Sequence, residues 1–298
     1  MRLTNWYFFA LIVGISATRD IEMVESEDWI MIRLISCDLD GTLLDEHECI
    51  FPESGKMLRN LFRNGTIIVL ATGRSWRSAL NIQQQLGIVG PIIAHDGGYV
   101  FDTSKNLELY KRIIPRPIAG SILHWGTQHQ VKIRYYLGYG KPVLYNFAYD
   151  ASTTSETLLH PSSPINVEPL EMYIFGETEI EKTVTQLGYQ GFGYEINVFP
   201  HPDYRKLTIN PPAVNKVHAL SALCSLVGVD RQEVMAIGDG DNDIQMIKWA
   251  GTGIAMGHGV AECANFAAYV TSNQVIEEPV LQGLIWASRQ GLLSLHAG

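Results

Sequence analysis

A short apolar segment that ends in two aspartates constrains the fold of this chain more than any other feature. Residues 32–37 (IRLISC) have the length of one buried strand of a parallel sheet. Asp38 and Asp40 follow this segment, and Gly41 allows a sharp backbone turn directly after them. Because side chains alternate along a strand, we expect both carboxylates to leave the strand end on the same side.

Two carboxylates at this separation repel each other, so one of them stays protonated or both share a cation. The pattern therefore indicates a Mg²⁺ site combined with a nucleophile and a general acid or base. The competing interpretation is a strand followed by an Asx turn, which explains most isolated Asp-x-Asp sequences. Further acidic and anion-binding motifs distinguish the two interpretations.

A second acidic loop follows another apolar segment and reads GDGDND, with carboxylates at Asp239, Asp241 and Asp243 and an amide at Asn242. Such a cluster at a strand end is costly to assemble unless a cation neutralises it. A calcium-binding loop is the alternative, because the three aspartates match the spacing of its first three ligands. A helix is expected immediately afterwards, however, and the twelfth position holds Ala250 and no glutamate.

Two weaker signals concern anion binding. Residues 66–71 form a β-branched apolar segment that ends in Thr72 and Gly73, and a helix is expected directly afterwards. A hydroxyl and free N–H groups near a helix start can hold a phosphate. Lys216 opens a later expected helix, where the dipole disfavours a cation, so it is either a surface lysine or the partner of a phosphate or carboxylate.

Taken in chain order, the four segments at Asp38, Thr72, Lys216 and Asp239 resemble the four motifs of the haloacid dehalogenase superfamily of phosphohydrolases. The resemblance covers about residues 31–285, and an α+β insertion between the second and third motifs resembles the cap of the Cof-type (subfamily IIB) phosphatases. It implies an α/β fold with a Rossmann-like doubly wound parallel sheet and an inserted α+β cap of the C2 type. The expected division is an N-terminal extension at 1–30, a core at 31–112 and 195–298, and a cap at 113–194, with a helix at 177–187.

The resemblance further implies a Mg²⁺-dependent phosphatase that hydrolyses a small phosphorylated metabolite, such as a sugar phosphate, through an aspartyl phosphate. Asp38 is expected to attack phosphorus, and Asp40 to act as general acid and then general base. The expected phosphate-binding residues are Leu39, Thr72, Gly73, Lys216 and Asn242, and the expected metal ligands are Asp38, Asp40 through its carbonyl, Asp239 and Asp243. A phosphotransferase or phosphomutase on the same core, or a catalytically silent binding protein, are the alternatives.

Three positions depart from the family pattern. Asp96 stands where many relatives have asparagine, Val217 where they have glycine, and His258 where they have a helix-capping asparagine. Asp96 adds a negative charge near the expected phosphate, and it is either a turn residue or a change in substrate preference. His258 is expected to lie outside the chemistry.

Composition restricts the partners of the protein. The 298 residues are 46% hydrophobic and 18% charged with a net charge of -9, which indicates packed domains and a poor nucleic-acid binder.

Four cysteines without CxxC spacing fit a cytoplasmic location. The apolar residues 6–17 are too short to span a bilayer but resemble a signal-peptide core, so secretion is expected only if residues 1–17 act as a signal. We expect residues 1–30 to be dispensable, no stable membrane partner, and a monomer or homodimer.

Overall fold

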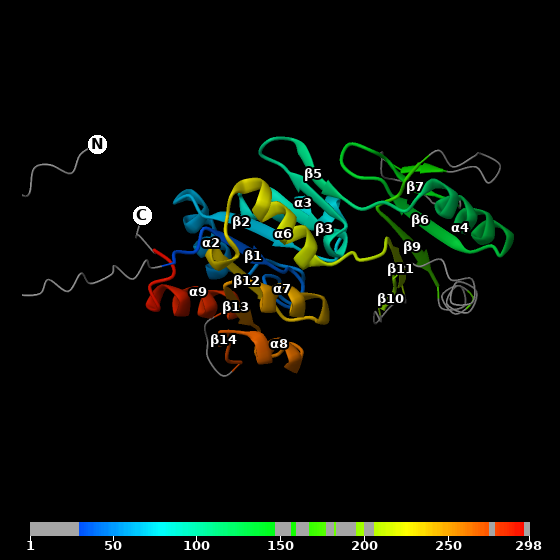
Figure 1. Ribbon diagram of the computed structural model, residues 1–298. Coiled ribbons are helices and arrows are strands. Elements are labelled where there is room, and N and C mark those ends of the chain that lie inside the picture. The colour runs from blue at the N-terminus through cyan, green and yellow to red at the C-terminus, as the bar shows by residue number, and fades with distance from the viewer. Residues whose placement is uncertain are drawn as a thin grey trace, which may run out of the picture.

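The computed structural model describes residues 30–146, 156–158, 167–176, 182, 195–199, 206–273 and 278–294. These residues form two β-sheets from different parts of the chain (Figure 1). The larger sheet has the strand order β14-β13-β12-β1-β2-β3-β4-β5, and the smaller sheet has the order β10-β11-β9-β6-β7-β8. The predicted helix at 177–187, apart from residue 182, and most of the predicted N-terminal extension lie outside the described residues.

The larger sheet is parallel from β14 to β3 and antiparallel at its other edge. Its strands are β1 (Leu34–Cys37), β2 (Ile67–Ala71), β3 (Pro91–Ala94), β4 (Tyr99–Asp102), β5 (Leu107–Lys111), β12 (Val234–Gly238), β13 (Thr252–Ala255) and β14 (Tyr269–Val270). β4 pairs antiparallel with both β3 and β5. This edge is antiparallel because a single 3-10 turn at residues 95–97 reverses the chain after β3 and leaves no room for a crossover helix.

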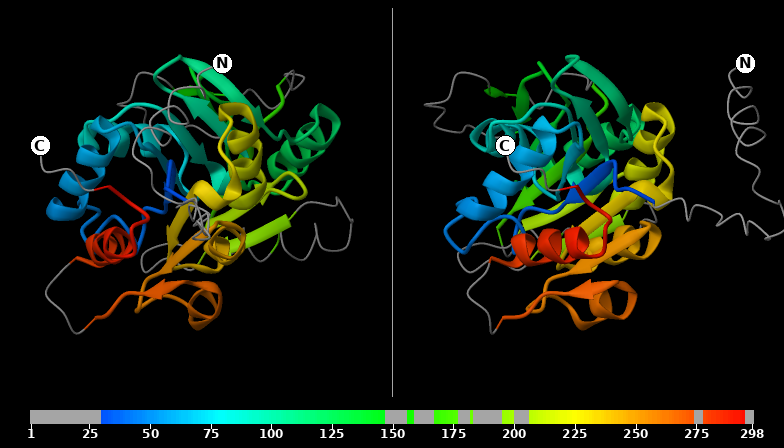
Figure 2. Two further views of the ribbon diagram at one scale, coloured as in Figure 1. Left: turned by 60° about the vertical axis from the view of Figure 1, so that its left-hand side comes forward. Right: turned by 90° about the vertical axis from the view of Figure 1, so that its left-hand side faces the viewer.

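Helices cover both faces of the larger sheet, as expected for a doubly wound α/β fold (Figures 1 and 2). On one face the core includes apolar residues of α2 (Pro52–Arg63), α3 (Trp76–Leu86) and α9 (Pro279–Arg289). On the other face it includes residues of α6 (Lys216–Val227) and α7 (Ile244–Trp249), and α8 (Ala261–Phe266) packs against α7 and β13. The predicted α/β core is confirmed.

Local sequence explains where the first two helices begin and end. α2 starts at Pro52, whose fixed φ suits the first turn. The Ser75 hydroxyl accepts the backbone N–H of Ser78 and caps α3, and Gly87 ends α3 with a left-handed φ of 71°. These boundaries place the segments between strand and helix at the carboxyl edge of the sheet, where the predicted site residues lie.

The smaller sheet extends beyond the predicted insertion. Its strands are β6 (Lys132–Tyr136), β7 (Val143–Tyr145), β8 (Glu156–Leu158), β9 (Glu171–Phe175), β10 (Glu195–Phe199) and β11 (Lys206–Asn210), and α4 (Arg116–Gln128) packs on one face. β11 pairs antiparallel with β9 and β10. The predicted boundary after residue 194 is therefore wrong, and residues 195–210 belong to the smaller sheet. Alternating apolar and polar residues in β11 identify a strand but do not identify the sheet that it joins.

Several contacts join the two sheets. The Tyr139 ring, from the β6–β7 loop, stacks on Phe101 of β4 at a centroid distance of 4.0 Å. Across the same junction, His95 Nδ1 lies 2.5 Å from Glu171 Oε2, and both side chains are buried. Among the described residues no helix combines the length and apolar character that a bilayer crossing needs.

Candidate active site

The topology brings the predicted motifs to one edge of the larger sheet. β1 lies between β12 and β2, and β3 pairs with β2, all in parallel. The segments that follow these four strands therefore emerge side by side at the carboxyl edge, where such folds bind ligands. They carry Asp38 after β1, Thr72 after β2, Asp96 after β3 and Asp239 after β12.

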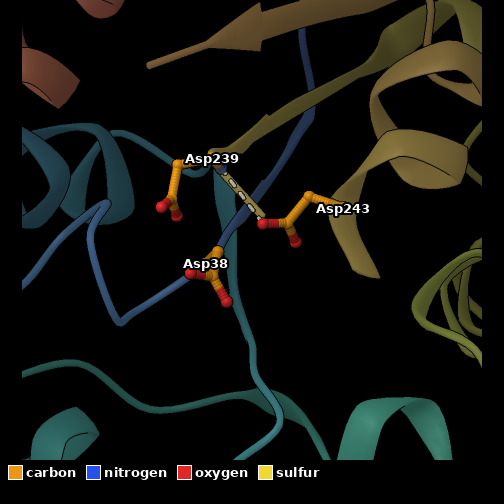
Figure 3. A group of neighbouring side chains, drawn as sticks. All are labelled: Asp38, Asp239 and Asp243. Atoms are coloured by element: carbon orange, nitrogen blue, oxygen red, sulfur yellow. Dashed lines mark hydrogen bonds between the residues drawn. The ribbon is translucent and has the colours of Figure 1, made fainter. Parts of the chain in front are cut away.

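Three carboxylates form the centre of the site (Figure 3). Oxygens of Asp38, Asp239 and Asp243 all lie within 4.8 Å of one another. Asp38 and Asp243 are buried. Asp243 is held by two backbone N–H groups, since its Oδ2 accepts from Asp239 at 3.1 Å and from Gly240 at 3.0 Å. The Thr42 hydroxyl donates to Asp239 Oδ1 at 2.8 Å and fixes that carboxylate in turn.

Lys216 supplies a buried cation within this cluster. Its Nζ lies 2.5 Å from Asp38 Oδ1 and 2.7 Å from Asp243 Oδ1, and its side chain is 0% exposed. The position follows from the start of α6, where the Asn215 side chain accepts the His218 N–H at 2.8 Å and caps the helix. Lys216 thus faces the two buried carboxylates, although the helix dipole alone does not favour a cation there.

The electrostatics of the cluster oppose full ionisation. Burial, followed by the charge of Asp243, raises the pKa of Asp38 well above its usual value. Burial also raises the pKa of Asp239. Burial lowers the pKa of Lys216, but the negative charges of Asp243 and Asp38 outweigh burial, so the pKa of Lys216 is raised overall. Lys216 is therefore charged, and the carboxylates still exceed it in number.

This donor set fits a hard divalent cation. Carboxylate oxygens are the ligands that Mg²⁺ prefers, and the three groups are close enough to share one ion. Asp38, Asp239 and Asp243 are the residues that would hold it, and a second cation beside Lys216 would balance the remaining negative charge.

Asp40 departs from the sequence prediction. Its exposed carboxylate lies outside the cluster and pairs with Arg74, whose Nε donates to Oδ1 at 3.1 Å and to Oδ2 at 2.8 Å. The strand ends at Cys37 and Gly41 turns with a φ of 75°, and the two carboxylates have different partners, Lys216 for Asp38 and Arg74 for Asp40. Alternation therefore does not extend to Asp40.

The predicted phosphate-binding residues differ in their contacts and in how they could reach a ligand. The Thr72 side chain is buried, and its hydroxyl accepts the Arg74 N–H at 3.0 Å. The Leu39 side chain is buried in the hydrophobic core, so this residue can reach a ligand only through its backbone. Gly73 and Asn242 both contact a residue outside the predicted set, Asp96. The structure brings these residues to the same edge as Lys216, but it gives Asn242 a carboxylate partner.

Three residues that contact the site's aspartates or the Gly41 turn were not assigned to the site by sequence analysis. Thr42 and Arg74 stand inside the first and second motifs, so their positions alone could have identified them. His258 was expected to lie outside the chemistry, yet its Nε2 lies 2.6 Å from the Gly41 carbonyl oxygen, and it lowers the pKa of the neighbouring Asp239 against the larger effect of burial. No pattern in the sequence predicts this last contact.

Residues 35–283 match the family model of the haloacid dehalogenase-like hydrolases. This match covers most of the chain, so the protein belongs to the haloacid dehalogenase-like hydrolase family.

Relatives and solved structures agree with this assignment. A 5-amino-6-(5-phospho-D-ribitylamino)uracil phosphatase of Bacillus subtilis is 28% identical over 256 residues, which cover 85% of this chain and 94% of that protein. A haloacid dehalogenase-like hydrolase from Bacteroides thetaiotaomicron has a TM-score of 0.69 at 26% identity, over 80% of this chain and 94% of its own. A subclass IIB sugar phosphatase shares the fold, with a TM-score of 0.65 at 21% identity over 88% of this chain and 100% of its own. The predicted resemblance to Cof-type phosphatases is confirmed.

Proposed function

We propose that the protein is a Mg²⁺-dependent phosphatase that hydrolyses a small phosphomonoester through a phosphorylated Asp38. The observation that carries this proposal is the buried pairing of Lys216 with Asp38 and Asp243, within 4.8 Å of Asp239. A carboxylate held by a lysine beside further carboxylates suits a nucleophile that must approach an anionic phosphoryl group. Curated relatives described as phosphatases support the proposal.

In the first step a carboxylate oxygen of Asp38 attacks phosphorus, and the bond between phosphorus and the leaving oxygen breaks. Asp40 gives its proton to that oxygen, for which its carboxyl group must first leave Arg74. In the second step Asp40 removes a proton from water, the water oxygen attacks phosphorus, and the bond to Asp38 breaks to release phosphate. Mg²⁺, when bound, would neutralise the charge of the carboxylates and of the phosphoryl group.

Within the site, Lys216 holds Asp38 in place and attracts the phosphoryl oxygens. We assign phosphate binding to Lys216, Thr72 and Gly73 and, after release from Asp96, to Asn242. The smaller sheet would act as the cap over this edge, because its Glu171 and the core residue His95 form a buried contact in the segment next to Asp96. Free thiols at all four cysteines support a cytoplasmic location.

The test is phosphate release from a panel of sugar phosphates, nucleotides and cofactor phosphates, with and without a chelator. We expect turnover that requires Mg²⁺ and that is lost in Asp38→Asn, because the amide has nearly the same shape but is not nucleophilic. Asp241→Asn is the matched control, since Asp241 is exposed in the same acidic loop.

Phosphate release by a folded Asp38→Asn protein, or activity that survives chelation, would contradict the proposed mechanism. Transfer of the phosphoryl group to a second sugar in place of water would favour a phosphotransferase or phosphomutase. Absence of any turnover with retained ligand binding would favour a silent binding protein.

A further inference from the structure

Asp96 is the buried carboxylate of the site for which the proposed chemistry has no use. It follows β3 in the 3-10 turn at residues 95–97, and it is 7% exposed. Its backbone N–H donates to the Thr72 carbonyl at 3.2 Å, which ties the turn to the end of β2. The side chain is thus fixed at the same edge of the sheet as the predicted phosphate-binding residues.

One oxygen of Asp96 lies beside two of the predicted phosphate-binding residues, Asn242 and Gly73. Asp96 Oδ1 accepts the Asn242 Nδ2–H at 2.8 Å. The same oxygen faces Gly73, where a Cβ atom would lie only 2.8 Å from it. Asp96 Oδ1 therefore accepts the hydrogen bond of the Asn242 amide and fills the space beside Gly73.

The charge of Asp96 also reaches the catalytic lysine. Asp96 is among the groups that raise the pKa of Lys216, after Asp243 and Asp38 and against the effect of burial. Four carboxylates, those of Asp38, Asp96, Asp239 and Asp243, share this single lysine, so the cluster carries -4 + 1 = -3 when all are ionised. A divalent cation would reduce the charge to -1, which still repels a phosphate dianion.

The backbone conformation does not explain the choice of aspartate. Asp96 has a left-handed φ of 53°, which asparagine and glycine adopt at least as readily. A turn alone would be served by a neutral residue, without the cost of burying a further negative charge at this edge of the sheet. The charge itself is the property that remains to be explained.

We propose that Asp96 is a specificity-determining residue: its carboxylate competes with the phosphoryl group for the Asn242 amide and for the space at Gly73, and so weakens binding of phosphate dianions. The site then releases inorganic phosphate readily and selects against ligands held mainly by their phosphate. The inference rests on the proposed function, since it places a phosphoryl group between Asn242, Gly73 and Lys216.

The test measures binding of inorganic phosphate to the full-length protein by calorimetry, with Mg²⁺ present, in wild type, Asp96→Asn and Asp96→Gly. Both substitutions remove the charge and tolerate the left-handed backbone, so either one decides the matter if the other fails to fold. We expect each to bind phosphate about tenfold more tightly, which corresponds to about 1.4 kcal/mol. Asp241→Asn removes an exposed negative charge from the same loop and should change affinity by less than about twofold.

Turnover gives a second readout on the same proteins. With a hydrolysed substrate, Asp96→Asn should lower KM and strengthen product inhibition by phosphate without raising kcat. Phosphate binding to the Asp96 variants that equals or falls below that of wild type, or an equal gain in Asp241→Asn, would overturn the inference while leaving phosphatase activity intact. If no variant hydrolyses any substrate, the proposed function fails, but tighter phosphate binding by the Asp96 variants would still support the role of Asp96.

Discussion

Replacement of Lys216 by methionine tests the electrostatic core of the site. Methionine has a similar length and no charge, so the substitution removes the cation with little change in packing. In the wild-type structure Lys216 Nζ pairs with Asp38 at 2.5 Å and with Asp243 at 2.7 Å, and the lysine side chain is 0% exposed. The substitution therefore leaves two buried carboxylates without their shared cation.

The expected loss of stability follows from these contacts. Removing one partner of a buried ion pair costs about 3–5 kcal/mol. Because burial and Asp243 already raise the pKa of Asp38, this carboxyl group can take up a proton and reduce the cost, so we expect the lower end, about 3 kcal/mol. At about 2–4 °C per kcal/mol, the melting temperature of metal-free Lys216→Met should fall by about 6–12 °C.

The assay is thermal unfolding of metal-free protein, followed by the same measurement with Mg²⁺. The metal should restore more than half of the lost stability, because it neutralises the carboxylates that the lysine paired with. Lys56→Met is the control, since Lys56 is an exposed lysine of α2 whose pair with Glu53 lies at the surface, and it should change stability by less than about 1 kcal/mol.

A Lys216→Met protein as stable as wild type without metal would refute the reasoning, because the carboxylates would then not need a cation. A loss of stability that Mg²⁺ does not reduce would refute the assignment of the metal to Asp38 and Asp243. Phosphate release by the variant should fall together with the affinity for phosphate, since Lys216 is also assigned to the phosphoryl group.

Two further predictions concern substitutions of Asp40, compared with Asp239, and of Asp102. Asp40→Asn should lower kcat by about 10²–10⁴-fold, yet Mg²⁺ should raise its melting temperature as much as that of wild type, because the Asp40 carboxylate pairs with Arg74 outside the cluster. Asp239→Asn should lose this stabilisation by metal, and an equal loss in both variants would place the Asp40 carboxylate on the ion. Asp102→Asn should lower the free energy of unfolding by about 1–2 kcal/mol at neutral pH: burial raises the pKa of Asp102, but hydrogen bonds from Ser104 outweigh it and lower the pKa overall. The stability that the Asp102 carboxylate contributes is present above its unfolded pKa of about 3.9 and is lost as the pH falls through its folded pKa. The free energies of unfolding of wild type and Asp102→Asn, measured by denaturant titration, should therefore converge in acid. A difference between them that stays constant with pH would contradict the account.

Segments with a strong local pattern could be predicted from the sequence. The β-branched residues 66–71 predicted β2, and the apolar residues 32–37 predicted β1, because a buried parallel strand leaves a continuous apolar segment. The place of Lys216 at a helix start left a surface lysine and the partner of a phosphate or carboxylate both open, the family resemblance favoured the second, and the structure places Lys216 against Asp38. Each of these predictions depends on residues that are close together in the sequence.

The errors depend on information that local sequence does not contain. The partner of the exposed Asp40 carboxylate is Arg74, which lies in the next strand-to-helix connection, 34 positions along the sequence. The extent of the smaller sheet is decided by the pairing of β11 with β9, and one strand pattern fits either sheet equally well. The contact of Asp96 with Asn242 joins residues 146 positions apart in the sequence.

The short return from the smaller sheet to the larger one has a consequence for protein engineering. Only residues 211–215 separate β11 from Lys216, and the carbonyl of Asn215 lies against Gly97, directly beside Asp96. A chimaera that takes its smaller sheet from a relative must therefore be joined within a few residues of Lys216. A one-residue shift at that junction would rotate Lys216 away from Asp38. Grafts that retain residues 211–216 of this chain should therefore keep their activity. Grafts joined inside this segment should lose activity, whatever substrate the new sheet selects.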